Sequence, residues 1–176
     1  NPDAAKGNSI QAAADQLSLV RAVPVIATAL DDADGLRDSL GLLDGDPAVS
    51  LADDVFFLGH SQGCHASTLA LAASDDVSTG VLSGAGGLLL ETFANKTSPY
   101  DLQSVLSVVL ADPGFDDVHT QPALNILQGV LEEADPTNYA KRLSDDPYDG
   151  NSAKNVLHVI GVGDTYTPNT TAMILA

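Results

Sequence analysis

The pentapeptide Gly59-His60-Ser61-Gln62-Gly63 contains the residues best suited to chemistry. A serine in the pattern Gly-x-Ser-x-Gly is typical of a sharp strand-to-helix turn, because the glycines let the backbone approach closely and leave the hydroxyl exposed. At the start of the following helix, the backbone N–H of Gln62 can donate to the oxyanion that forms when Ser61 attacks an acyl carbon. The pattern therefore predicts nucleophilic catalysis by Ser61, with Gln62 as an oxyanion donor.

The segments on either side of the pentapeptide favour this interpretation over a chance match. Before it, Val55 to Leu58 is a short apolar run that suits a strand buried on both faces of a parallel sheet. After it, Cys64 to Ala73 is rich in Ala and Leu and suits a helix. The order of strand, tight turn and helix is the context that the pattern requires. Cys64 is the only cysteine, and we expect it to be a packing residue.

A serine nucleophile needs a base, and the base needs a carboxylate to orient it. Asp164 follows the apolar segment from Val156 to Val162, which is a predicted strand. Because the carboxyl ends of parallel strands share one edge of a sheet, we expect Asp164 on the same side as Ser61. The alternative is that Asp164 caps a helix beginning near Asn169. We favour the triad role.

These segments resemble a known family. The stretch from Gly59 to Ala66 and the stretch from Gly163 to Pro168 are similar to the corresponding parts of the α/β-hydrolase superfamily, particularly of secreted bacterial and fungal lipases and esterases. The similarity in the order of elements covers nearly the whole chain. It implies hydrolysis of a small-molecule or lipid-like ester through an acyl-serine intermediate, without metal or organic cofactor. It also implies a secreted or cell-envelope location.

The chain departs from the superfamily in its histidines. In the superfamily the triad histidine follows the acid on a later loop, whereas no histidine follows Asp164 here. His60, His65 and His158 suit structural roles better, and His119 is the best substitute if its region folds over the serine. The loop that supplies the second oxyanion donor in the superfamily is also missing.

The expected fold is α/β: a partial α/β-hydrolase domain over residues 1–176, with a parallel sheet flanked by helices. A helix is predicted from Ser9 to Arg21, continuing past Pro24 to Leu30, and a further strand from Val77 to Ser83. Residues 88–155 are too long for a simple crossover. They form either a helical insertion or cap over the site or a helical layer packed on the sheet, with helices expected over residues 102–110, 123–131 and 138–143.

A buried parallel strand without a neighbour would expose unpaired backbone and apolar side chains. Because the strand from Val55 to Leu58 lacks the partner that the superfamily provides, we expect a missing segment or a second chain to complete the sheet. The same segment or chain would supply the histidine.

Composition excludes several classes of partner. The chain has 24 acidic and 7 basic residues, a formal net charge of −17, which repels nucleic acid and anionic lipid surfaces. The acid-rich run from Asp31 to Asp54 reads as a solvated surface loop and not as a metal site. Two other functions stay open: a catalytically inactive, hydrolase-like binding module, and a peptidase or acyltransferase on the same fold.

Overall fold

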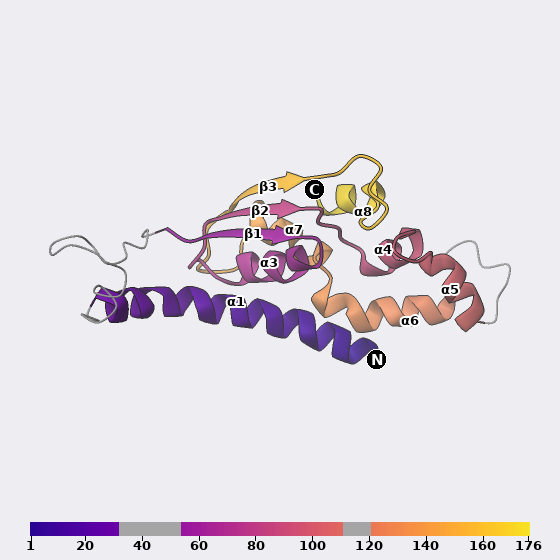
Figure 1. The fold of residues 1–176 in the computed structure, drawn as a ribbon, viewed down its shortest axis with the longest axis horizontal. Coiled ribbons are helices and arrows are strands. Elements are labelled where there is room, and N and C mark those ends of the chain that lie inside the picture. Colours follow the sequence, from indigo (N-terminus) through magenta and orange to yellow (C-terminus); the bar gives the residue numbers. More distant parts are fainter. Residues whose placement is uncertain (32–53, 111–120) are drawn as a thin grey trace, which may run out of the picture.

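The structure is a computed structural model and describes residues 1–31, 54–110 and 121–176. Three parallel strands form its sheet: β1 (Phe56–His60), β2 (Thr79–Ser83) and β3 (Asn155–Val159), in the order β1-β2-β3 (Figure 1). The predicted parallel sheet flanked by helices is confirmed. The observed strands differ from the predicted ones at their ends: β2 begins later than the predicted Val77, and β3 ends earlier than the predicted Val162.

Helices separate and flank these strands. The predicted first helix is longer than expected, and it continues through Pro24 without interruption. The helix predicted after the pentapeptide begins directly at Gln62. The described helices are α1 (Pro2–Asp31), α3 (Gln62–Ala73), α4 (Leu89–Asn95), α5 (Leu102–Val109), α6 (Pro122–Leu131), the 3-10 helix η2 (Glu132–Ala134), α7 (Thr137–Leu143) and α8 (Asn169–Leu175).

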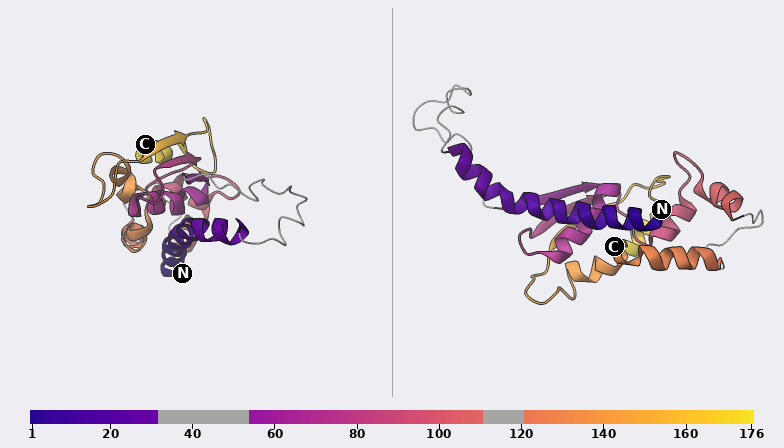
Figure 2. Two further views of the ribbon diagram at one scale, coloured as in Figure 1. Left: turned by 90° about the vertical axis from the view of Figure 1, so that its left-hand side faces the viewer. Right: turned by 90° about the horizontal axis from the view of Figure 1, so that it is seen from below.

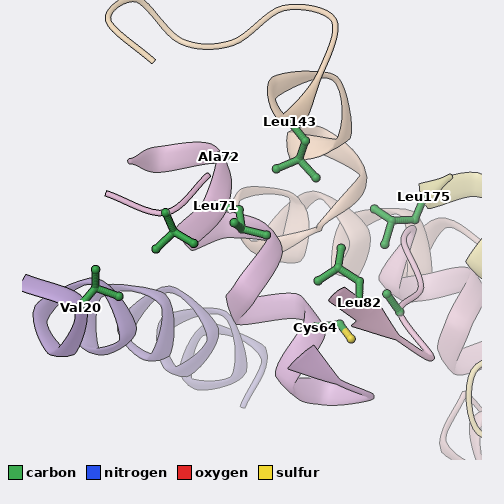
Figure 3. Close-up of a cluster of buried hydrophobic side chains, with 9 residues drawn as sticks. Val20, Cys64, Leu71, Ala72, Leu82, Leu143 and Leu175 are labelled. Carbon is green, nitrogen blue, oxygen red and sulfur yellow. The ribbon is translucent and has the colours of Figure 1, made fainter. Parts of the chain in front are cut away.

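The main core lies between the sheet and helix α3. Helix α3 packs against β1 and β2, and α1 and α7 pack against α3 in turn. Figure 3 shows the buried side chains that these elements share, including Cys64 and Leu71 of α3 and Leu82 of β2. Cys64 is fully buried, which confirms its predicted packing role. Burial raises the pKa of its thiol to about 11.

The opposite face of the sheet is open to solvent in the described chain. Along β1, Phe57 packs into the core below, whereas Phe56 and Leu58 point the other way and are 62% and 77% exposed. Leu157 of β3, which is in register with Leu58 across the intervening strand β2, is also exposed. The expectation that this strand is buried on both faces is therefore wrong for the described residues, because α3 covers only one of its two faces.

Residues 88–155 divide into two parts. Helices α4, α5 and α6 lie beyond the carboxyl ends of the strands, and α6 also packs against α1 (Figures 1 and 2). Helix α7, in contrast, packs against α3. The first part is therefore placed where it can form walls around the carboxyl edge of the sheet, and the second belongs to the helical layer.

Candidate active site

Ser61 occupies the turn between β1 and α3, as the sequence predicted. Its backbone has φ 51° and ψ −122°, a conformation that residues with a side chain rarely adopt. Two hydrogen bonds hold it there: the Ser61 N–H donates to the Ser83 carbonyl of β2, and the Cys64 N–H donates to the Ser61 carbonyl, both at 2.9 Å. The serine is thus fixed in a strained turn at the carboxyl edge of the sheet.

The two glycines of the pentapeptide serve different purposes. A side chain at Gly59 would place its Cβ only 3.0 Å from the Cα of Cys64 and 3.2 Å from its backbone nitrogen, so only glycine lets α3 pack this closely on β1. A Cβ at Gly63 would meet nothing within 4 Å. The first glycine allows the turn to form, whereas nothing packed against the second requires a glycine there.

The Ser61 hydroxyl and the Gln62 N–H are both available. The Ser61 side chain makes no capping hydrogen bond to α3, although Ser61 is the N-cap residue of that helix. Among the described residues, no group accepts a hydrogen bond from the Gln62 N–H, which belongs to the unpaired first turn of the helix. A hydroxyl and a free helix N–H are therefore adjacent at one turn, which is the arrangement that stabilises an acyl oxyanion.

Asp164 is held by its own loop, after β3. Its Oδ1 accepts hydrogen bonds from the backbone N–H groups of Tyr166 at 2.8 Å and Thr167 at 3.0 Å. The alternative that it caps the next helix is wrong, because α8 begins at Asn169 with Pro168 as its N-cap. Its Oδ2 faces the end of β2, 3.9 Å from the place where a Cβ on Gly84 would stand.

The Ser61 turn and the Asp164 loop therefore meet at one edge of the sheet. Ser61 is bonded to Ser83, the last residue of β2, and Asp164 lies beside Gly84, the next residue along. The predicted placement on one side is thus observed. Their side chains are not hydrogen-bonded to each other or to any described histidine.

The described histidines have other partners. His158 Nε2 lies 3.2 Å from the Ala85 carbonyl oxygen, and the exposed His60 has its Nδ1 3.4 Å from the Ser83 hydroxyl. His65 is half-buried in α3, where burial lowers the pKa of its ring; the nearby Lys96 lowers it further and Asp135 opposes this. His119, the proposed substitute base, lies outside the described residues.

A cavity of about 370 Å³ opens in front of Ser61. Its walls come from parts of the chain that are far apart in sequence: the first turns of α1, the start of α3, helix α4, the end of α6 with η2, and the loop after β3. The lining residues are Ala5, Lys6, Asn8, Ser9, Ser61, Gln62, His65, Leu89, Thr92, Phe93, Lys96, Leu131, Ala134, Tyr166 and Thr167.

The wall formed by Lys96 and Tyr166 was not predicted from the sequence. The backbone N–H groups of Thr97 and Ser98 both donate to the Thr165 carbonyl, at 3.0 and 3.1 Å, and so tie the end of α4 to the Asp164 loop. The Lys96 ammonium lies 5.6 Å from the centroid of the Tyr166 ring, within cation–π range. These contacts fix a positive charge beside the cavity that Ser61 lines.

Asp135 is a further residue of the site that was not predicted from the sequence. It is fully buried, and its carboxylate accepts hydrogen bonds from the N–H groups of Leu88 at 2.9 Å and Leu89 at 2.7 Å, and also from Thr137. Burial raises the pKa of this carboxyl, but the hydrogen bonds, first that from Gln128, outweigh it and hold the pKa below its usual range. Asp135 thereby anchors the start of α4, a wall of the cavity.

Comparison of the chain with protein-family models, curated proteins and solved structures finds no match in any of the three. Across residues 1–31, 54–110 and 121–176, no three His, Cys, Asp or Glu side chains are grouped so that they could hold a metal ion. None of the helices described in these ranges combines the length and the apolar character needed to cross a membrane.

Proposed function

We propose that this protein is a serine hydrolase of the α/β-hydrolase type that cleaves carboxylic esters, as lipases and esterases do. The observation that carries the proposal is the backbone of Ser61, with φ 51° in a strand-to-helix turn that opens on a cavity. Such strain costs about 1–3 kcal/mol and persists where it serves a function. We place the protein outside the cytoplasm, in the secreted or cell-envelope fraction.

The proposed reaction has two halves. First, the Ser61 Oγ bonds to the ester carbonyl carbon while a histidine takes its proton, and the Gln62 N–H donates to the resulting oxyanion. The C–O bond of the ester then breaks, and the histidine returns the proton to the departing alkoxide. In the second half water attacks the acyl-serine in the same way, releasing the carboxylic acid and restoring Ser61.

Asp164 is the acid that orients the histidine in this scheme. Its Oδ1 is committed to two backbone N–H groups, which fixes the carboxylate, and no described residue donates a hydrogen bond to its Oδ2. A fixed carboxylate with one free oxygen is suited to accept the Nδ1–H of an imidazole.

The histidine itself, we propose, comes from protein outside this sequence, together with a strand that pairs with β1. One observation supports this: β1 pairs only with β2 in the described sheet, while Phe56 and Leu58 stay exposed. No described histidine bonds to Asp164, which leaves His119 as the alternative within the sequence. The natural reading frame tests the proposal. We expect it to encode a histidine a few tens of residues after Ala176, or the protein to co-purify with a chain that supplies one.

A fluorophosphonate probe tests the nucleophile. We expect the full-length natural protein to be labelled, the label to map to Ser61, and Ser61→Ala to lose labelling together with roughly 10⁶-fold of kcat. The matched control is Ser144→Ala, which removes an exposed hydroxyl after α7 and should label like the wild type.

Two results would replace this function with another. Absence of labelling in the folded full-length protein would favour the catalytically inactive, hydrolase-like binding module. Labelling combined with faster cleavage of amides than of matched esters, or with transfer of the acyl group to an added acceptor, would favour a peptidase or an acyltransferase.

A further inference from the structure

The cavity in front of Ser61 has the opposite charge to the chain as a whole. The chain carries 24 acidic and only 7 basic residues, yet two lysines, Lys6 and Lys96, line the cavity and no described Asp or Glu does. In a molecule so rich in acids, a cavity with lysines alone is a local reversal of sign. Such a reversal favours binding of a negatively charged group.

Of the two lysines, Lys96 carries the uncompensated charge. Lys6 forms an ion pair with Glu133, at 3.1 Å, whereas Lys96 forms none with any residue in the described ranges. The remaining described lysines and arginines are either ion-paired or outside the cavity. Arg21, Arg142 and Lys154 are ion-paired, and Lys141 is exposed and does not line the cavity.

The position of Lys96 has a structural advantage, because it follows the last residue of α4 and a cation is favourable at a helix C-terminus. A favourable position at the helix end does not explain why the ammonium lines the cavity and lies over the Tyr166 ring. A neutral substrate that displaced water from the cavity would desolvate this ammonium without a partner, at a cost, whereas an anionic group would pair with it.

We propose that the cavity selects esters that also carry a carboxylate, such as monoesters of dicarboxylic acids. Lys96 binds the free carboxylate while Ser61 attacks the ester carbonyl, and Tyr166 is the positioning residue that holds the ammonium. This inference rests on the proposed esterase function and adds the substrate class to it. It narrows the expectation of a small-molecule or lipid-like ester to an ester that also carries a negative charge.

Paired methyl esters test the selection in the full-length protein. Monomethyl glutarate is anionic and dimethyl glutarate is neutral and of similar size, and a pH-stat follows the hydrolysis of both. We expect Lys96→Gln to lower the ratio of kcat/KM for the anionic ester over the neutral one by about tenfold. Lys96→Glu should lower this ratio further. The control Lys141→Gln, which removes an exposed lysine that does not line the cavity, should leave the ratio within about twofold.

Monomethyl succinate and monomethyl adipate then give the preferred spacing between carboxylate and ester. A ratio that Lys96→Gln leaves unchanged, in a variant with wild-type circular dichroism, overturns the inference.

A binding experiment separates this inference from the proposed function. In Ser61→Ala, which cannot turn the ester over, we expect NMR titration to show saturable binding of monomethyl glutarate with shifts at Lys96 and Tyr166. The double variant Ser61→Ala, Lys96→Gln should not bind it. If this binding is seen but the wild type hydrolyses neither ester, the esterase function fails and the anion subsite stands. If the wild type hydrolyses both esters but binding does not depend on Lys96, the subsite fails and the esterase stands.

Discussion

The two loops at the carboxyl edge of the sheet differ in whether their polar side chain is held by hydrogen bonds within the loop. At the first, the backbone of Ser61 is strained and its side chain makes no capping hydrogen bond. At the second, Asp164 has a negative φ, and its Oδ1 accepts hydrogen bonds from two backbone N–H groups of its own loop. The difference matches what a nucleophile and an orienting acid need: a hydroxyl free to react and a carboxylate fixed in place.

The two loops also depend on different supports. The strain at Ser61 is held by β2 and by the close approach of α3, which belong to the core. The Asp164 loop is held by hydrogen bonds to Gly84 and to the end of α4. Substitutions can therefore disturb one loop while leaving the other intact.

After Ser61→Ala, the largest effect is expected from Asp164→Asn. The amide oxygen can still accept the N–H groups of Tyr166 and Thr167, so the free energy of unfolding should stay within about 0.5 kcal/mol of wild type. Without the negative charge, however, the histidine is poorly oriented, and kcat for ester hydrolysis should fall about 10⁴-fold. Asp164→Ala removes the acceptor too and should cost about 1–3 kcal/mol in urea unfolding. Wild-type activity in the Asn variant would assign the acid to another residue.

Next in size is Gly59→Val, which acts on the first loop. Its side chain would collide with the backbone of Cys64, so we expect a loss of about 1–3 kcal/mol in unfolding free energy and loss of fluorophosphonate labelling, because the Ser61 turn must shift. Gly63→Ala is the matched control. Its Cβ enters open space, and the variant should be at least as stable as wild type. Equal stability of the two variants would mean that α3 is not packed on β1 as described.

Thr167→Val should have a smaller effect on the second loop. The buried Thr167 hydroxyl donates to the Gly84 carbonyl at 3.0 Å, and its loss leaves that carbonyl without this partner. We expect about 1 kcal/mol of destabilisation, measured by urea unfolding, with a modest rise in KM and little change in kcat. A fall in kcat as large as that of Asp164→Asn would show that this hydroxyl fixes the acid's position.

The smallest effect concerns His65, in the first turn of α3 and in the wall of the cavity. Its pKa is lowered in the folded protein, chiefly by burial, so the unfolded chain binds a proton here at a higher pH than the folded one. Stability from this site is therefore present above pH about 6.5 and declines as pH falls below that value. We expect His65→Gln to flatten the slope of unfolding free energy between pH 7 and 5. Parallel slopes for the variant and wild type would contradict this.

Local sequence patterns correctly predicted the features that depend on a few neighbouring residues, namely the turn at Ser61 and the position of Asp164 after a strand. The glycines that permit a tight, positive-φ turn identified Ser61, and the apolar run before Asp164 placed it at the correct sheet edge. Burial of β1 on both faces was predicted wrongly, because an apolar run shows that a strand prefers burial but not which face is covered. The predictions for residues 32–53 and for His119 lie outside the described residues.

The cavity walls could not be predicted in this way. Lys96 and Tyr166 are seventy positions apart, and Asp135 holds the start of α4 from a distance of 46 residues. Such pairs are set by tertiary packing and leave no periodic signal in the sequence. The sequence does show that lysine is scarce in this acidic chain, which makes each lysine a candidate for binding a negatively charged group.

Because Cys64 is completely buried, it should not compete with Ser61 for electrophilic labels. It is the sole thiol of this sequence, three positions from the serine, and its high pKa keeps it in the protonated, unreactive form at neutral pH. Alkylating reagents such as iodoacetamide should leave the folded chain untouched. An electrophile that becomes attached to this stretch of peptide in the folded chain is therefore not on the thiol, and the cysteine need not be replaced before the label is mapped.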